Sequence, residues 1–495
     1  MPSWSFQKRL QRELCLSYNE VFKDETYFSI PGIRNYLCCF NLKLTFDFSA
    51  YNFPDFNCNF TFRFNLTMRV VSVKCVYWFR RDLRTVDNKG LYEATQQCDV
   101  IYPLVVIDRN IMEREDTSPR RAFFYLQSLN SLREKIPLTI KGGDPVEEVP
   151  KFVRNMGASA VFFNRDYGYY ATKRDSNVCE RVQCITFKDH VLVEPGELPL
   201  YKVFTPYFRK WSEVPKEKPY PEASGNFEGR NNPVPEKEDY TVPCSNEECA
   251  RERVFMEDKG TTMLSPFIKV GLVSERFIYW NTKSERVRRQ LCWRDFYIQL
   301  YTSDYRLLTN GVRKEIKYDN DPKLIEAWKE GETGIPIVDA AMRELNDTGW
   351  MDNRLRLVTS FLLTKVMLVD WRIGALHFMK NLLDGEFIIN TANWQWSAGV
   401  GVDTRPLRRY NIVKQSKEYD SEGIYIKKWV DELDGVPAEY IHEPHKMPLE
   451  LQEKLGIKIG KDYPYPVVDV DEGYREFVRR YKEVHENVLM RDSTP

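Results

Sequence analysis

Short apolar runs alternate with amphipathic stretches between residue 73 and about residue 195. The apolar runs predict five β-strands, over residues 73–79, 100–107, 138–141, 160–164 and 183–187. Helical stretches lie between them, and strands that alternate with helices indicate a parallel sheet with crossover helices. The pattern therefore predicts a Rossmann-like α/β domain over residues 68–195.

Beyond residue 251 the apolar positions repeat with a helical period almost to the end of the chain. One predicted helix starts near Asn353 and has Leu355, Val358, Leu362, Val366 and Val369 on one face. A last, short helix is predicted from Tyr474, Phe477, Tyr481, Val484 and Val488. These patterns predict an all-helical domain over residues 251–488, followed by a tail at 489–495.

Two segments differ from both predicted domains. Residues 196–250 carry many prolines, which indicates a long interdomain linker without an element of its own. Residues 1–67 form an atypical N-terminal extension, in which positions 40–64 alternate aromatic and polar residues as exposed-edge strands do. This extension is either an accessory segment or the product of a misplaced translation start.

Composition narrows the class of protein. The 495 residues suggest two or three domains, and 72 Lys plus Arg balance 72 Asp plus Glu, so a nucleic-acid partner would need a local basic face. The 11 cysteines lack metal-ligand spacing, so we expect reduced thiols, a cytoplasmic protein and no metal site. No apolar run reaches the roughly 18 residues of a membrane helix.

Three stretches carry candidate chemistry. Residues 260–266 place a glycine and hydroxyl residues before a proline-opened helix, a pattern that fits either an anion site or an ordinary helix cap. Residues 291–296 continue a basic helix with Arg286, Arg288 and Arg289, which fits a solvated face or a phosphate-contacting surface with an aromatic platform. Residues 334–396 place polar side chains among aliphatic ones, and these would need a polar cofactor or salt bridges as partners.

This last stretch resembles the FAD-binding helical domain of DNA photolyases and cryptochromes. The resemblance runs from residues 73–84, similar to the first strand of that family, through residues 201–206, 261–265 and 293–294 to residues 463–469. The motifs keep the family's order, and they cover nearly everything after Met68. The resemblance implies an α/β antenna domain, a long linker and an all-α FAD-binding domain.

The resemblance also implies which residues bind FAD. The loop Thr261, Thr262, Met263, Leu264 and Ser265 would hold the pyrophosphate, and Arg294, Asn353, Arg356, Asp384, Glu386 and Asn390 would surround the flavin. Arg356 and Asp384 match an ion pair beside the flavin ring, where a cation favours the anionic reduced form. Asn390 matches the residue that faces flavin N5, and Glu386 replaces the aspartate usual in the family.

Three aromatic residues match the family's electron relay, although each would also fit an ordinary core. Trp394 would lie nearest the flavin, Trp371 in the middle and Tyr318 at the surface end. The third position is normally tryptophan. Because a tyrosine must release its phenolic proton when it is oxidised, we expect slower or less reversible photoreduction.

Trp293 and Trp396 match the pair that clamps a flipped-out lesion, which favours repair of DNA. Gln290 matches a glutamine of enzymes for the six-four photoproduct, but Leu357 stands where those enzymes carry a catalytic histidine. Since leucine cannot donate a proton, we expect the cyclobutane dimer as substrate. The basic rim is expected to comprise Arg286, Arg288, Arg289, Arg405, Arg408, Arg409 and Lys414.

The resemblance thus implies a light-driven photolyase that uses reduced FAD to repair cyclobutane pyrimidine dimers. Its partner would be damaged DNA with a flipped-out dimer, and it would act as a monomer away from membranes. A second, antenna chromophore of unknown identity would bind near residues 164–167, Arg174 and Asp175. The alternatives are a cryptochrome-type blue-light photoreceptor and repair of the six-four photoproduct.

Overall fold

The computed structural model describes residues 40–42, 68–70, 72–236, 240, 242, 245–254 and 261–491. Residues 1–71 and 72–495 form two compact units, which are described separately. In the first unit, β1 (Phe40–Leu42) pairs antiparallel with β2 (Met68–Val70). The rest of the strands predicted over residues 40–64 lies outside the described residues.

A five-stranded parallel sheet opens the second unit. Its strands are β3 (Lys74–Phe79), β4 (Val100–Asp108), β5 (Thr139–Gly143), β6 (Ala160–Asn164) and β7 (Cys184–Phe187), in the order β5-β4-β3-β6-β7. All four pairings are parallel. The five predicted strands and the α/β fold class are confirmed.

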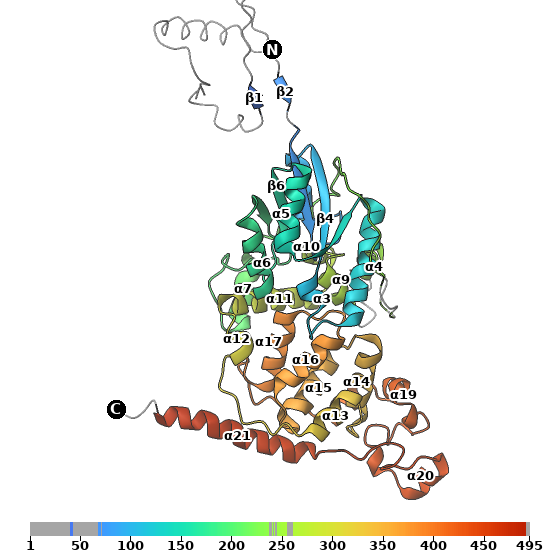
Figure 1. The fold of residues 1–495 in the computed structure, drawn as a ribbon. Helices are drawn as coiled ribbons and strands as arrows, with labels where there is room; N and C mark the ends of the chain where they lie inside the picture. The colour runs from blue at the N-terminus through green and yellow to red at the C-terminus, as the bar shows by residue number, and fades with distance from the viewer. Residues whose placement is uncertain are drawn as a thin grey trace, which may run out of the picture. The chain divides into compact units, whose positions relative to one another are not determined.

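The sheet is covered on both faces, as its mainly apolar strands require. On β3, Tyr77 and Phe79 face one hydrophobic core, while Val76 and Trp78 face another. The first core also contains Phe124 of α4 (Pro119–Lys135), and the second contains Phe152 of α5 (Pro145–Met156). Figure 1 shows the blue strands between these helices.

Helices make up most of the remaining chain. Around the sheet lie α2 (Lys89–Gln97), α3 (Arg109–Met112) and α6 (Tyr169–Cys179). The following elements are α7 (Phe204–Glu213), α8 (Glu247–Val254), α9 (Ser265–Val270), α10 (Glu275–Asn281), α11 (Glu285–Ser303), α12 (Leu307–Asn310), α13 (Pro322–Glu330), α14 (Pro336–Thr348), α15 (Asn353–Phe361), π-helix η3 (Leu362–Val366), α16 (Trp371–Asn381) and α17 (Phe387–Ala398). The chain ends with α18 (Ile412–Tyr419), α19 (Ile424–Trp429), η4 (Asp431–Leu433), η5 (Pro444–Lys446), α20 (Leu449–Leu455) and α21 (Val470–Arg491).

The helical second part of the chain is confirmed, with two corrections. The helix predicted from Asn353 is α-helical only to Phe361 and continues as the π-helix η3, so Val369 lies beyond it. The last helix, α21, has 22 residues and is not short. The proposed domain boundaries at residues 195 and 250 stay predictions, because residues 72–495 form one compact unit.

The predicted linker contains a packed helix, so the expectation of no element there is wrong. Helix α7 buries Phe204, Tyr207 and Trp211. Trp211 Nε1 donates a hydrogen bond to Asp295 Oδ2 of α11 at 2.7 Å, and the backbone N of Val193 donates to the same oxygen at 2.9 Å. The prolines around α7 hid the helical repeat of its three apolar residues.

Four cysteines correct the prediction of reduced thiols. Disulfide bonds join Cys75 to Cys98 and Cys179 to Cys184. Cys292, in contrast, is a free thiol buried in α11. Within the described ranges, no helix is long and apolar enough to cross a membrane, and no cluster of His, Cys, Asp or Glu could hold a metal ion.

Candidate flavin and DNA-lesion site

An ion pair between α15 and the segment before α17 marks the centre of the candidate site. Arg356 Nη2 donates to Asp384 Oδ2 at 2.8 Å, and Arg356 Nε donates to the carbonyl of Met351 at 2.9 Å. The pair that the resemblance implies is therefore formed. The other carboxylate oxygen, Asp384 Oδ1, is buried and has no hydrogen-bond partner among the described residues.

Glu386 anchors the start of α17 to the sheet. Arg81, which follows β3, donates from Nη1 to Glu386 Oε1 at 2.9 Å and makes a second bond to Oε2. Lys269 Nζ and Arg294 Nη2 lie 3.6 Å and 3.7 Å from Oε2. Burial alone would raise the pKa of Glu386, but Arg81, Lys269 and Arg294 outweigh it and hold that pKa well below its usual range.

The neighbouring cation, Arg294 of α11, is only partly satisfied. Its Nε donates to Glu275 Oε1 at 2.9 Å. Its Nη2 is buried and makes no hydrogen bond within the described part of the chain. Together with Asp384 Oδ1, this atom leaves the site with an unused donor and an unused acceptor.

Asn390 lies one turn into α17 and contacts α16. Its Nδ2 donates to the carbonyl of Ala375 at 3.0 Å, and its backbone N donates to the carbonyl of Glu386 at 2.8 Å. One amide N–H is thus used within the protein. The carbonyl oxygen and the second N–H remain available to a ligand.

The other predicted cofactor-binding residues lie at or just before the first residues of α9 and α15. Ser265 is the first residue of α9, and Thr261 and Ser265 are exposed, whereas Leu264 is buried and holds the loop. Met263 has a positive φ of 49°, which turns the backbone just before α9. Asn353 is the first residue of α15 and is exposed. Gly260 of the same motif lies outside the described residues.

The predicted lesion-binding residues come from three helices, of which α11 and α15 both pack on α17. Gln290 and Trp293 belong to α11, Leu357 to α15 and Trp396 to α17. Trp293 stacks on Phe204 of α7, with ring centroids 3.6 Å apart and planes within 2°. Because Phe204 supports Trp293, the linker helix is part of this site.

The predicted basic rim is divided in the structure. The Arg408 guanidinium lies over the ring of Trp396 at 5.0 Å, and the Arg289 guanidinium lies over Phe204 at 5.1 Å. Arg288, in contrast, donates to the carbonyl of Thr282, and Arg409 pairs with Asp471 of α21. The first two arginines lie beside the predicted lesion-binding aromatics, whereas Arg288 is bound to a backbone carbonyl and Arg409 remains exposed at the surface in its ion pair.

Two of the three predicted relay residues are core tryptophans. Trp394 and Trp371 are each 2% exposed. A Cβ on Gly374 would lie 2.1 Å from Trp394, so only glycine lets this ring pack on α16, one turn from Trp371. Tyr318 is half-buried, and its hydroxyl is buried without a hydrogen-bond partner among the described residues.

Comparisons with known proteins match both halves of the second unit. The models of DNA photolyase and of the FAD binding domain of DNA photolyase match residues 75–224 and 287–483. Deoxyribodipyrimidine photo-lyases of Alkalihalophilus pseudofirmus and Salmonella typhimurium are 38% and 32% identical, over 80% and 79% of this chain and 95% of each relative. The chain belongs to the DNA photolyase family.

A solved photolyase structure agrees with this assignment. The archaeal photolyase from Sulfolobus tokodaii has a TM-score of 0.76 and 29% identity, over 83% of this chain and 100% of that one. That protein holds two FAD molecules, which imply a novel light-harvesting cofactor. The predicted family, fold and FAD-binding domain are confirmed for this photolyase-family chain.

The residues of the site fit FAD. A buried acceptor on Asp384 and a buried donor on Arg294 make no hydrogen bond among the described residues, and each buried polar group without a hydrogen bond costs roughly 1–3 kcal/mol. A flavin and its diphosphate carry complementary donors, acceptors and charge. Photolyase-family FAD would therefore satisfy groups that this chain leaves open.

Sequence analysis did not predict two aromatic contacts, that of Trp328 with Trp394 and that of Phe204 with Trp293. Trp328 of α13 is fully buried, and its ring centroid lies 5.9 Å from that of Trp394. Phe204 was seen only as part of a linker motif. Nothing in the sequence indicates that Trp328 packs near Trp394. The spacing of Phe204, Tyr207 and Trp211, in contrast, is helical and could have predicted α7.

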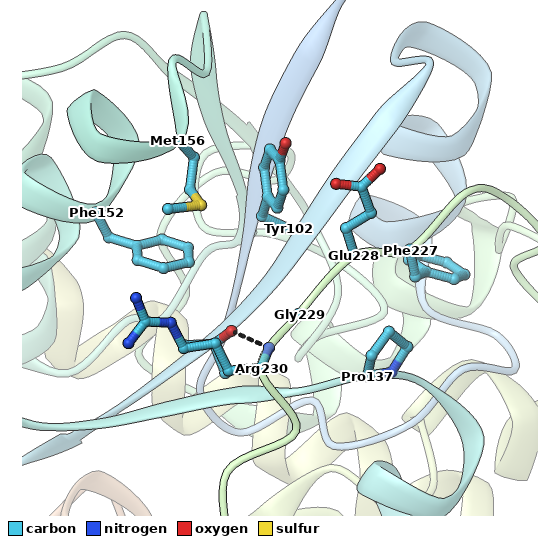
Figure 2. A pocket seen from close by; sticks show the side chains of 9 residues that line it. Tyr102, Pro137, Phe152, Met156, Phe227, Glu228, Gly229 and Arg230 are labelled. Carbon is cyan, nitrogen blue, oxygen red and sulfur yellow. Dashed lines mark hydrogen bonds between the residues drawn. The ribbon is translucent and has the colours of Figure 1, made fainter.

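A separate cavity of about 430 Å³ lies at the amino ends of β4 and β5 (Figure 2). Tyr102, Phe152, Met156 and Phe227 contribute apolar side chains, and Glu228 and Arg230 contribute charged ones. None of the predicted cofactor-binding or lesion-binding residues lines it. In open α/β sheets ligands usually bind at the opposite, carboxyl ends of the strands, so this cavity is not part of the photolyase site.

Proposed function

We propose that this protein uses light and reduced FAD to split cyclobutane pyrimidine dimers in DNA. Family membership supports the class of reaction, because the relatives are named deoxyribodipyrimidine photo-lyases. The observation that carries the proposal within this chain is the Arg356–Asp384 pair, whose buried carboxylate keeps one unpaired oxygen.

The chain's residues have distinct roles toward the cofactor. Arg356 and Arg294 place positive charge where a reduced flavin would carry negative charge, and Asp384 offers an acceptor to a ring N–H. Asn390, held by Ala375, presents a neutral carboxamide that does not transfer a proton. When bound, reduced FAD supplies the electron that opens the dimer. Trp394 and Trp371 provide electrons that keep the cofactor reduced.

DNA is held by stacking and by positive charge. Trp293, supported by Phe204, and Trp396, covered by Arg408, would be the two walls for a dimer turned out of the duplex. Each base–aromatic stack contributes about 1–3 kcal/mol. A dimer is already poorly stacked in DNA, so its extrusion costs less than that of normal bases.

The location of the histidines supports the cyclobutane lesion over the six-four photoproduct. The chain has 5 histidines: His190, His377, His442, His445 and His485. None of them belongs to α11, α15 or α17, the helices of the lesion site. Leu357 is aliphatic, so these three helices supply no imidazole proton donor, which cyclobutane splitting does not need.

Illumination of the reduced protein with DNA that contains a defined thymine dimer tests the proposal. We expect restored thymines in the light and none in the dark. Trp293→Ala and Trp396→Ala should weaken binding of dimer DNA by about 1–3 kcal/mol each, whereas Trp280→Ala, an exposed tryptophan of α10, should not. Repair of the six-four lesion alone would contradict the substrate, and light-dependent absorbance changes without any repair would favour a photoreceptor.

A further inference from the structure

The indole of Trp371 donates to a carboxylate. Its Nε1 lies 3.3 Å from Glu315 Oε1, in the segment between α12 and α13. Glu315 also accepts two bonds from Arg372, at 2.6 Å and 3.0 Å, which hold its carboxylate in place. The hydrogen bond therefore joins an oxidisable ring to a fixed, charged acceptor.

The next residue of the expected relay lacks such an acceptor. The hydroxyl of Tyr318 is buried without a partner in the described part of the chain. Burial raises the pKa of Tyr318, and the negative charges of Glu315 and Asp370 raise it further. Oxidation of a tyrosine requires loss of the phenolic proton, and no described residue accepts a hydrogen bond from this hydroxyl.

A second tryptophan near Trp394 has a weaker acceptor. The ring of Trp328 lies 5.9 Å from that of Trp394, but its Nε1 donates to the backbone carbonyl of Thr359 at 3.0 Å. An amide carbonyl is a far weaker base than a carboxylate. An oxidised Trp328 would therefore keep its proton and return the hole to Trp394.

We infer that Glu315 accepts the Nε1 proton of oxidised Trp371, so that the relay ends in a neutral indolyl radical on Trp371 rather than on Tyr318. This inference rests on the proposed function, because it requires Trp394 and Trp371 to supply electrons to the flavin. It assigns Glu315 a role in photoreduction that the resemblance does not imply.

The electrons and protons balance within these groups. With FAD bound, Trp394 would give one electron to the light-excited flavin, and Trp371 would restore Trp394 with one electron of its own. The N–H bond of Trp371 then breaks, and the proton bonds to Glu315 Oε1. One electron has left Trp371, and one proton has moved from indole to carboxylate, which becomes a carboxylic acid.

Local charge favours this proton transfer. The Arg372 guanidinium lies 4.5 Å above the ring of Trp371, where it repels a radical cation but not a neutral radical. Glu315 is 24% exposed, so its new proton can pass to solvent. Return of the electron from the flavin to Trp371 would then require a proton as well, which slows recombination of the two radicals.

Transient absorption of the FAD-loaded protein, after a light pulse to the oxidised flavin, tests the inference. In wild type we expect the tryptophanyl radical cation to convert to the neutral radical, more slowly in D₂O than in H₂O. Glu315→Gln should slow this conversion on the order of 10²-fold, the usual contribution of a positioned proton acceptor. Asp370→Asn is the matched control, because Asp370 also pairs with Arg372 and caps α16, yet is not the recorded acceptor of the Trp371 N–H.

Each outcome separates the inference from the proposed function. A tyrosyl radical in wild type that disappears in Tyr318→Phe would overturn the inference, as would a cation lifetime unchanged in Glu315→Gln. Absence of any tryptophanyl radical in wild type would remove the relay on which the inference rests. Failure of wild type with chemically reduced flavin to split dimers would instead refute the proposed function.

Discussion

Two polar clusters of this photolyase-family protein contrast in how they use their hydrogen-bonding groups. At the carboxyl end of the sheet, Asn164 Nδ2 lies 2.8 Å from Asp82 Oδ2 and 2.9 Å from Asn88 Oδ1, and Asn164 Oδ1 accepts from the backbone N of Gly90 at 3.0 Å. Tyr77 donates to Asp82 Oδ2 at 2.7 Å. This cluster is closed, since its members satisfy one another.

The cluster around Arg356, Asp384 and Arg294 is open by comparison. Asp384 Oδ1 and Arg294 Nη2 are buried and make no hydrogen bond among the described residues. A closed buried network holds the fold together, whereas an open one remains costly until a ligand completes it. Asn164, expected beside an antenna chromophore, thus has its hydrogen bonds within the protein, whereas Asp384, expected beside FAD, keeps a free acceptor among the described residues.

Breaking the closed cluster should have the largest effect on stability. Asn164→Leu removes the bonds that Asn164 donates to Tyr77, Asp82 and Asn88 and leaves the backbone N–H of Gly90 without its acceptor. We therefore expect the free energy of unfolding to fall by about 3 kcal/mol. Urea denaturation measures this, with the exposed Asn310→Leu as control. FAD content per folded molecule should not change, and a selective loss of FAD would contradict a purely structural role.

Changing the open cluster should affect FAD more than the fold. Asp384→Asn removes the charge that pairs with Arg356, and we expect the Kd for FAD to rise roughly thirtyfold, about 2 kcal/mol. Flavin fluorescence titration measures the Kd. Asp352→Asn is the control, because asparagine caps α15 as well as aspartate does. If Asp384→Asn lowers the free energy of unfolding by more than it weakens FAD binding, Asp384 has a structural role like that of the closed cluster.

A buried histidine beside Arg81 should make the sheet region sensitive to acid. Burial, together with the nearby charge of Arg81, lowers the pKa of His190 to about 3. Between pH 6.5 and 3 the unfolded chain binds a proton that the folded chain excludes, so stability falls as the pH drops. At pH 5.5 this costs about 1.4 kcal/mol relative to pH 7.5.

Urea denaturation of wild type and His190→Gln at both pH values isolates this contribution from the titration of other groups. The variant should lose about 1.4 kcal/mol less on acidification than wild type. Equal losses in the two proteins would show that His190 does not titrate differently in the folded and unfolded chains.

The smallest effect is expected at the rim of the DNA-binding face. Arg409 is exposed and paired with Asp471. Arg409→Ala should weaken binding of dimer DNA only a few-fold and lower the salt dependence by about one unit of slope. Titration over a range of salt concentrations measures both, with exposed Arg306→Ala as control. An unchanged slope would exclude Arg409 from phosphate contact.

Several features were readable from the residues because they depend on local pattern. Short apolar runs located all five strands, and helical repeats located the helical second half, since burial imposes these patterns wherever the chain folds. The Arg356–Asp384 pair could be named from family motifs alone. Helix α7 was missed because prolines dominated the pattern around Phe204, although Tyr207 and Trp211 pack like core residues.

The amino-acid sequence by itself determined the class of fold and the family, and it supplied the residues that we propose for FAD and DNA. The tertiary structure alone decided the partners: Glu386 with Arg81, 305 positions apart, Trp293 with Phe204, and Trp371 with Glu315. Repeats along a chain record which side chains are buried, but not which distant group each one meets. That choice depends on how separate elements pack, and it distinguishes a closed polar cluster from one that still needs a cofactor.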